Sequence, residues 1–142
     1  MAYALKEASP DLHVVAVSAA NARVMYEILK AGEPVRMEEE ETLAEALSGG
    51  IGVTNRFTLP LIRELADEHV LVSEEDIRAA MLFAAGSMNI LLEGGGAVAL
   101  AAVLARRWDA SRRGVEGAAA VVLSGGNVAL PRLQAIQETE PA

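Results

Sequence analysis

Short runs of apolar residues alternate with segments of helical hydrophobic spacing along this 142-residue chain. The apolar runs have the length of strands that are buried on both faces of a sheet. They lie at residues 12–17, 69–72 and 118–123. The helical segments lie at residues 2–8, 24–31, 58–67, 77–85 and 94–107, with a short helical turn at 42–47. This order predicts an α/β fold with a three-layer, mostly parallel sheet flanked by helices, in a single domain over residues 1–142.

Local signals mark the ends of several of these helices. Gly32 is expected to end the second helix, because glycine readily adopts the left-handed backbone conformation that follows many helices. Thr58 is expected to be the N-cap of the third helix, with Pro60 just inside it. Ser73, followed by Asp76 three residues later, predicts a capping box for the fourth helix.

Composition narrows the class of protein. Hydrophobic residues make up 52% of the chain, and the formal net charge is −8. Lysine and arginine form no run longer than a pair, so a basic surface for nucleic acid is not expected. Cysteine is absent, which excludes disulfides and thiolate chemistry. No segment has the length and hydrophobicity of a membrane span or the order of a signal peptide, so we expect a cytoplasmic protein.

Two polar residues stand where apolar runs meet glycines. Ser124 follows the run at 118–123 and precedes Gly125 and Gly126. Such a serine either turns the chain or faces a ligand at the mouth of a parallel strand. Glu93 precedes three glycines at 94–96. It either caps the following helix or directs a carboxylate into a site.

Other chemistries have little support in the sequence. A serine nucleophile requires a nearby base, but His13 and His69 lie at strand starts, away from the ligand-facing ends. Neither histidine has a neighbour at metal-ligand spacing, so no metal site is predicted. The glycines at 49–52 are not followed by the lysine of a phosphate-binding loop.

Three segments together resemble the C-terminal half of the serine/threonine dehydratases, which are pyridoxal-phosphate enzymes of the tryptophan-synthase-β fold, also called fold type II. These segments are residues 42–47, 93–100 and 121–128. Residues 58–65 and 70–77 fit the same alignment, and residues 17–18 and 48–52 look most like the hydroxyectoine-utilisation branch. The resemblance implies that this chain is part of the large domain of such an enzyme.

The resemblance also implies a cofactor site for pyridoxal phosphate. Ser124 would hydrogen-bond the pyridine nitrogen, Glu93 would lie near the ring, and Ala46 replaces a glycine whose backbone lies beside it. Gly125, which leaves room beside the serine, is counted with these cofactor-binding residues. Some relatives hold a divalent ion with two carboxylates at the positions that are Ser18 and Val24 here, so that metal site is not expected.

The family's Schiff-base lysine and phosphate loop belong to the N-terminal half, outside these 142 residues. Lys6 and Lys30 are not in a lysine motif of the family, so no catalytic residue is assigned. Strands without the other half would have unpaired edges, which predicts a homo-oligomer or a complementary N-terminal chain.

The resulting expectation is the C-terminal portion of an ammonia-lyase that eliminates water from a hydroxy-amino acid, without turnover as an isolated chain. One alternative is a non-catalytic interaction module or one half of a split enzyme. Another is a free-standing α/β domain that binds a small anion at its glycine-rich turns.

Overall fold

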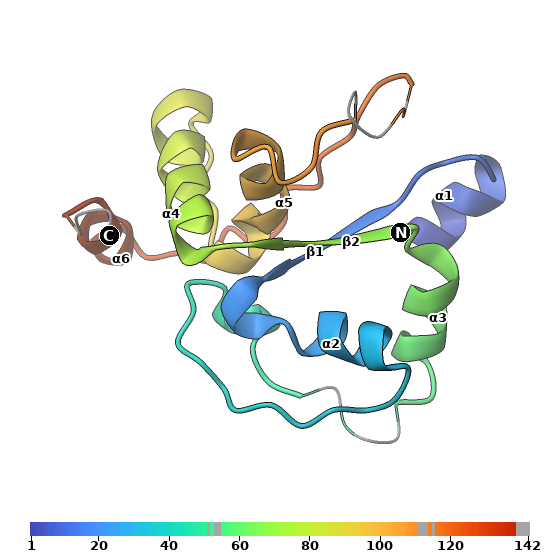
Figure 1. Cartoon of the computed structure of the whole chain (residues 1–142). Coiled ribbons are helices and arrows are strands. Elements are labelled where there is room, and N and C mark those ends of the chain that lie inside the picture. The colour runs from blue at the N-terminus through green and yellow to red at the C-terminus, as the bar shows by residue number, and fades with distance from the viewer. Residues whose placement is uncertain (51, 53–54, 111–113, 115, 139–142) are drawn as a thin grey trace.

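The computed structural model describes residues 1–50, 52, 55–110, 114 and 116–138 (Figure 1). The helices are α1 (Ala2–Ala8), α2 (Val24–Ala31), α3 (Thr58–Leu65), α4 (Glu74–Phe83), α5 (Gly94–Leu104) and α6 (Leu130–Glu138). The strands are β1 (Val15–Ala19) and β2 (Glu68–Val72). Short 3-10 turns lie at η1 (Ala20–Ala22) and η2 (Glu45–Leu47), and a π-helical turn, η3 (Ala84–Met88), extends α4.

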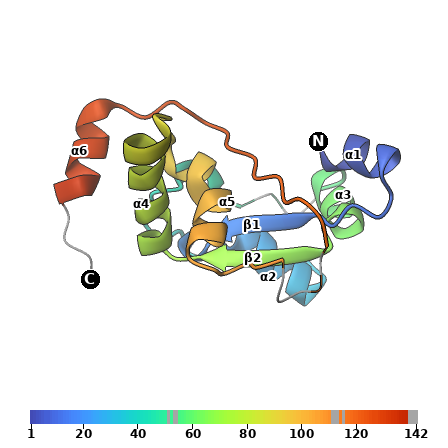
Figure 2. The same ribbon diagram turned by 90° about the horizontal axis from the view of Figure 1, so that it is seen from above.

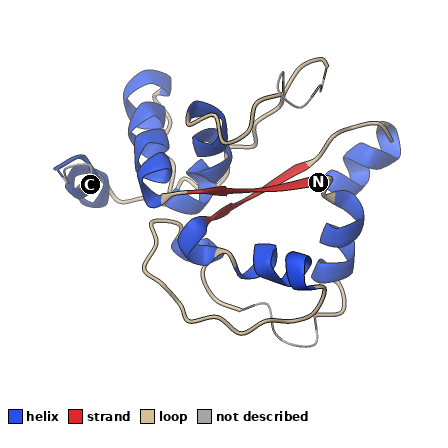
Figure 3. Ribbon diagram, viewed as in Figure 1, coloured by secondary structure: helices blue, strands red, loops and turns tan. Residues whose placement is uncertain are grey.

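The two strands are parallel, and their register runs from Val15 opposite Glu68 to Ala19 opposite Val72. Helices α4 and α5 cover one face of the strands, and α2 and α3 lie on the other (Figures 1 and 3). The predicted α/β class and the three layers are therefore confirmed. Because the strands are parallel, Ala19 and Val72 end at the same edge, which we call the carboxyl edge.

The main core lies between the strands and the pair α4–α5. Alternate strand residues point to one face, so Ala19, Val70 and Val72 are buried against this layer. Ile77 and Met81 of α4 join them, and Ile77 is fully buried, which stabilises the fold by about 2–3 kcal/mol. The small residues of α5 allow its close approach to the strands, as the alanine-rich sequence predicts.

The helix ends follow the predictions with one correction. Gly32 has a φ of 80° and ends α2, and Ser73 and Asp76 form both hydrogen bonds of the capping box. Thr58 is not the N-cap of α3, because that position belongs to Phe57. The Asn55 side chain accepts the hydrogen bond from the Leu59 amide at 2.8 Å instead, so an upstream amide group caps the helix.

The third predicted strand is wrong for the described residues. Residues 118–123 are not in a strand, and they belong to the long connection that runs past the sheet between α5 and α6 (Figure 2). Val121 and Val122 remain 37% and 46% exposed. Strand pairing requires a neighbouring strand in register as well as an apolar run, and although β1 and β2 each keep one open edge, this segment pairs with neither of them. None of the described helices is long and apolar enough to cross a membrane.

Candidate cofactor site

The site lies at the N-terminus of α5, where two other segments of the chain pack against the start of this helix. One segment is the loop that contains Thr42 to Leu47, called here the 42–47 loop. A Cβ atom built on Gly94 would collide with the carbonyl of Leu43 and lie 2.8 Å from the Ala44 nitrogen. One built on Gly95 would lie 3.5 Å from the Cβ of Ala46. The backbone of this loop therefore rests directly on the start of α5.

The second segment, residues 124–126, packs on the same helix start. A Cβ atom on Gly96 would collide with the Ser124 carbonyl oxygen and lie 2.9 Å from the Gly125 carbonyl oxygen. The Glu93 amide donates a hydrogen bond to that Gly125 oxygen at 2.9 Å. Gly125 has a φ of 80°, and its Cβ would lie 2.8 Å from Cδ of Glu93, so any side chain here would displace the Glu93 carboxyl.

The structure brings the four predicted cofactor residues to one place. Gly125 contacts Glu93, the Ser124 carbonyl packs on Gly96, and Ala46 lies beside Gly95. The role of these glycines was missed in the sequence. Three consecutive glycines at a helix start are unfavourable for helix formation, which is itself a signal that backbone approaches closely there.

Glu93 was expected either to cap α5 with its side chain or to direct its carboxylate into a site, and the structure distinguishes these two interpretations. Its backbone is extended, with φ −76° and ψ 163°, so the residue occupies the N-cap position of α5. Its side chain caps no amide of the helix, and instead it covers Gly125. The half-buried Glu93 carboxylate accepts no hydrogen bond from the residues that the structure describes, which leaves it available to a ligand.

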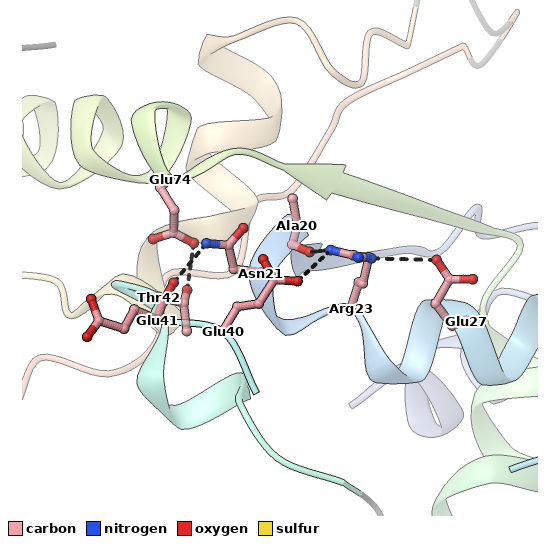
Figure 4. A network of polar contacts seen from close by, with 8 residues as sticks. All are labelled: Ala20, Asn21, Arg23, Glu27, Glu40, Glu41, Thr42 and Glu74. Carbon is pink, nitrogen blue, oxygen red and sulfur yellow. Dashed lines mark hydrogen bonds and ion pairs between the residues drawn. The ribbon is translucent and has the colours of Figure 1, made fainter. Parts of the chain in front are cut away.

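A network of polar contacts holds the 42–47 loop at the carboxyl edge (Figure 4). Glu74, the first residue of α4, accepts hydrogen bonds from the Thr42 hydroxyl and the Leu43 amide, each at 2.7 Å. Asn21, just after β1, donates to the Glu41 carbonyl at 2.8 Å. Arg23 donates to the Ala20 carbonyl at 2.6 Å and contacts Glu40 at 3.4 Å. The loop is therefore tied to the ends of both strands.

Neither lysine lies at this edge. Lys6 donates to Asp67 at 2.7 Å, directly before the start of β2, and this hydrogen bond lowers the pKa of the Asp67 carboxyl. Lys30 lies in the last turn of α2, a helix that begins at the carboxyl edge and runs away from it. Both amines thus lie at the amino edge of the sheet, opposite the carboxyl edge that holds the 42–47 loop.

The histidines also lie outside the site. His13 faces Glu68 at the start of β2, with 3.7 Å between the imidazole nitrogen and the carboxylate oxygen. His69 Nε2 is 2.9 Å from the Ser18 hydroxyl, so Ser18 is engaged in the sheet. Val24 begins α2. Among the described residues no group of three acidic or histidine side chains could hold a metal ion.

Because His69 is partly buried in its neutral form, we expect the stability of the fold to decrease at acidic pH. Its buried Nδ1 finds no hydrogen-bond partner among the described residues, its ring packs edge-on against Tyr26 at 5.5 Å, and burial lowers its pKa below 6.5. As the pH falls, the histidine of the unfolded chain binds a proton at a higher pH than the buried His69 of the folded chain. The free energy of unfolding is therefore unaffected by His69 above about pH 6.5. Below it, the free energy of unfolding decreases by at most about 1.4 kcal/mol per pH unit.

Urea unfolding at several pH values between 7.5 and 5.5 measures this loss. The His69→Gln variant keeps a group that can bond Ser18 but cannot titrate, so its stability should fall less steeply than that of the wild type. Parallel curves for the two proteins would show that His69 is not the responsible group.

Comparison with known proteins gives the family. Residues 1–125 match the family described as pyridoxal-phosphate dependent enzymes, and the chain belongs to it. The chain is 35% identical over 138 residues to the L-threonine ammonia-lyase of Geobacter sulfurreducens, covering 97% of this chain and 33% of that protein. It is 33% identical over 141 residues to the serine racemase of Mus musculus, covering 99% and 40%.

A solved structure extends the comparison to the fold. The chain superposes on maize serine racemase with a TM-score of 0.81 at 26% sequence identity, covering 96% of this chain and 41% of that one. The chain thus spans between 33% and 41% of the length of these three relatives. Pyridoxal phosphate, the expected cofactor, is the cofactor of the family.

Proposed function

We propose that this chain is the C-terminal part of a pyridoxal-phosphate-dependent ammonia-lyase of the serine/threonine dehydratase type, and that it forms one wall of the cofactor site. The observation that carries the proposal is the packing of Ser124 and Gly125 against Gly96 and Glu93, with Ala46 on the opposite flank. Ser124, Gly125 and Gly126 are exposed beside the Glu93 carboxylate, and the two glycines present no side chain to a flat aromatic ring there. The residues present therefore fit this part of the cofactor.

Each residue of this wall has a role in the proposal. The Ser124 hydroxyl would bind the pyridine nitrogen, and as a neutral group it would not hold that nitrogen protonated as a carboxylate would. Gly125 gives the ring access to the serine, and Glu93 would fix its edge. Ala46 would pack beside it. When bound, pyridoxal phosphate supplies the electron sink at the substrate α-carbon.

The reaction would be the elimination of water from a hydroxy-amino acid, after which hydrolysis gives a keto acid and ammonia. A proton must leave the α-carbon, and the amine of a lysine is the usual base in this family. Lys6 and Lys30 lie on the wrong side of the sheet for this task. We therefore place the base in a segment outside these 142 residues, either preceding them or on a separate chain.

A non-catalytic interaction module is the second candidate, and the exposed run at 118–123 would be its binding surface. Val121 and Val122 present apolar side chains in a segment that pairs with no strand of the described chain. A strand supplied by another chain would cover this surface in either candidate. The two differ in whether the partner brings a lysine to the carboxyl edge.

Borohydride trapping tests the assignment of the lysines. The chain alone, incubated with pyridoxal phosphate and then reduced, should show no stoichiometric adduct at either lysine by peptide mass analysis, because neither amine lies near Ser124. Lys6→Arg and Lys30→Arg variants control for slow surface labelling. Stoichiometric modification of Lys6 or Lys30 that Ser124→Ala abolishes would show a complete site in this chain and refute the proposed division.

A further inference from the structure

We propose that Glu74 is a positioning residue for the cofactor site, acting through the 42–47 loop. This inference rests on the proposed function, because it assumes that Ala46 flanks the cofactor ring. The carboxylate is half-buried, and both of its oxygens are used. One accepts from the Thr42 hydroxyl at 2.7 Å (Figure 4). The other accepts from the Leu43 amide, also at 2.7 Å.

These hydrogen bonds also fix the backbone of the 42–47 loop. The Thr42 hydroxyl also accepts a hydrogen bond from the Ala44 amide at 3.0 Å, so Glu74 organises three consecutive residues. Ala44 is fully buried, and with Leu43 it rests on Gly94. Two residues further on, the Ala46 methyl group meets Gly95. Hydrogen bonds to a charged acceptor are stronger than neutral ones, so this carboxylate fixes how the loop sits on α5.

Glu74 is not needed to begin its own helix. The capping box of Ser73 and Asp76 already satisfies that end of α4. Glu75, in the same turn, is exposed and pairs with Arg78 at 3.3 Å. Glu74 and Glu75 therefore have the same charge and the same relation to the helix dipole, but Glu74 alone of the two binds the loop. Glu75→Ala is thus a matched control for Glu74→Ala.

Hydrogen exchange on the full 142-residue chain tests whether Glu74 holds the 42–47 loop in place. Glu74→Ala should speed exchange of the Leu43 and Ala44 amides by about tenfold or more, since a bond to a charged group is lost. The Ile77 amide within α4 should change little, and Glu75→Ala should change neither region. Thr42→Val should reproduce the effect at Ala44, and combining it with Glu74→Ala should add less than the sum of the two.

Cofactor retention tests whether the position of the 42–47 loop affects binding of the cofactor. The probe is pyridoxal phosphate itself, bound to a complex of this chain with the preceding segment of the Geobacter sulfurreducens ammonia-lyase and followed by absorbance after desalting. Glu74→Ala should weaken retention by about tenfold, Glu74→Gln should be intermediate because it keeps one acceptor oxygen, and Glu75→Ala should match the wild type.

Three results would overturn the inference, two from hydrogen exchange and one from cofactor retention. One is unchanged exchange at Leu43 in Glu74→Ala, and the other is faster exchange throughout α4, which would show a general loss of stability. Normal cofactor retention by Glu74→Ala would remove its link to the site. If the wild-type complex itself retains no cofactor, the proposed function is wrong and the inference about the cofactor falls with it, whatever the exchange data show.

Discussion

Gly96→Ala is expected to destabilise the chain by about 3 kcal/mol, at the upper end of the cost of overpacking. The added methyl group would collide with the backbone carbonyl of Ser124 and lie 2.9 Å from that of Gly125. Backbone cannot rotate away as a flexible side chain can, so either the 124–126 segment or α5 must move. For a chain of this size the melting temperature should fall by roughly 10 °C.

The same variant should lose the cofactor wall, because the Glu93 amide bonds the Gly125 carbonyl only while these segments touch. Gly86→Ala is the matched control, since a Cβ there would meet nothing within 4 Å. Circular dichroism melting of the two variants makes the comparison. A Gly96→Ala protein that melts with the wild type would show that residues 124–126 do not pack on α5 as described.

Elements that depend on local sequence were predictable. The positions of β2 and α2 follow from short-range periodicity, and Ser73 with Asp76 defines a helix start within one turn. The first strand, predicted at residues 12–17, is displaced along the chain, because β1 runs from Val15 to Ala19. Thr58 was assigned wrongly because the Asn55 side chain competes for the same orphan amides. Such competition between nearby caps is not resolved by residue preference alone.

The run at 118–123 could not be assigned correctly because its structure depends on a partner. Its residues have the composition of a buried strand, but strand pairing is a property of two segments. In the described chain neither β1 nor β2 pairs with the run, which is in no strand and is partly exposed. The sequence specifies that this segment is apolar, and only a neighbouring strand could specify its pairing.

The predicted site residues lie close together in the structure, and their role in cofactor binding stays a prediction. Ser124, Gly125, Glu93 and Ala46 came from a resemblance, and the structure brings them together. The contact of the 94–96 glycines with two backbone segments required the fold. Glu74 was missed for the same reason, since it lies 32 residues from Thr42 in the sequence. Long-range hydrogen bonds leave no periodic signal.

The alternative of an anion site at Gly49, Gly50 and Gly52 stays a prediction, because these glycines line a pocket that contains both basic and acidic side chains. Gly50 and Gly52 have open space around them, and a Cβ on Gly49 would lie 3.7 Å from the Glu39 carboxylate. A neighbouring negative charge opposes anion binding. The glycines of α5 are in close contact with backbone, whereas those at 49–52 are not.

Complementation is expected to create activity where neither component has any. The segment that precedes the matched part of the Geobacter sulfurreducens ammonia-lyase is the proposed source of the lysine and the phosphate loop. The matched part itself is 35% identical to this chain over 138 residues. Mixed with this chain, pyridoxal phosphate and L-threonine, the preceding segment should release keto acid and ammonia. Ser124→Ala should lower the turnover number by about 10- to 100-fold, because one hydrogen bond to the ring is lost.

Two controls define this experiment. Ser87→Ala removes a hydroxyl from an exposed position in η3 and should leave turnover unchanged. The relative's own C-terminal segment, mixed in the same way, shows that the preceding segment is competent. An effect of Ser124→Ala on turnover without an effect on melting temperature would separate a contact with the cofactor from a structural role.

The most direct test of the central claim is the formation of keto acid from L-threonine by the mixture, compared with each component alone. The account predicts product only in the mixture, with dependence on pyridoxal phosphate and on Ser124. Product from this chain alone, or no product from the mixture when the relative's own C-terminal segment restores activity, would contradict it.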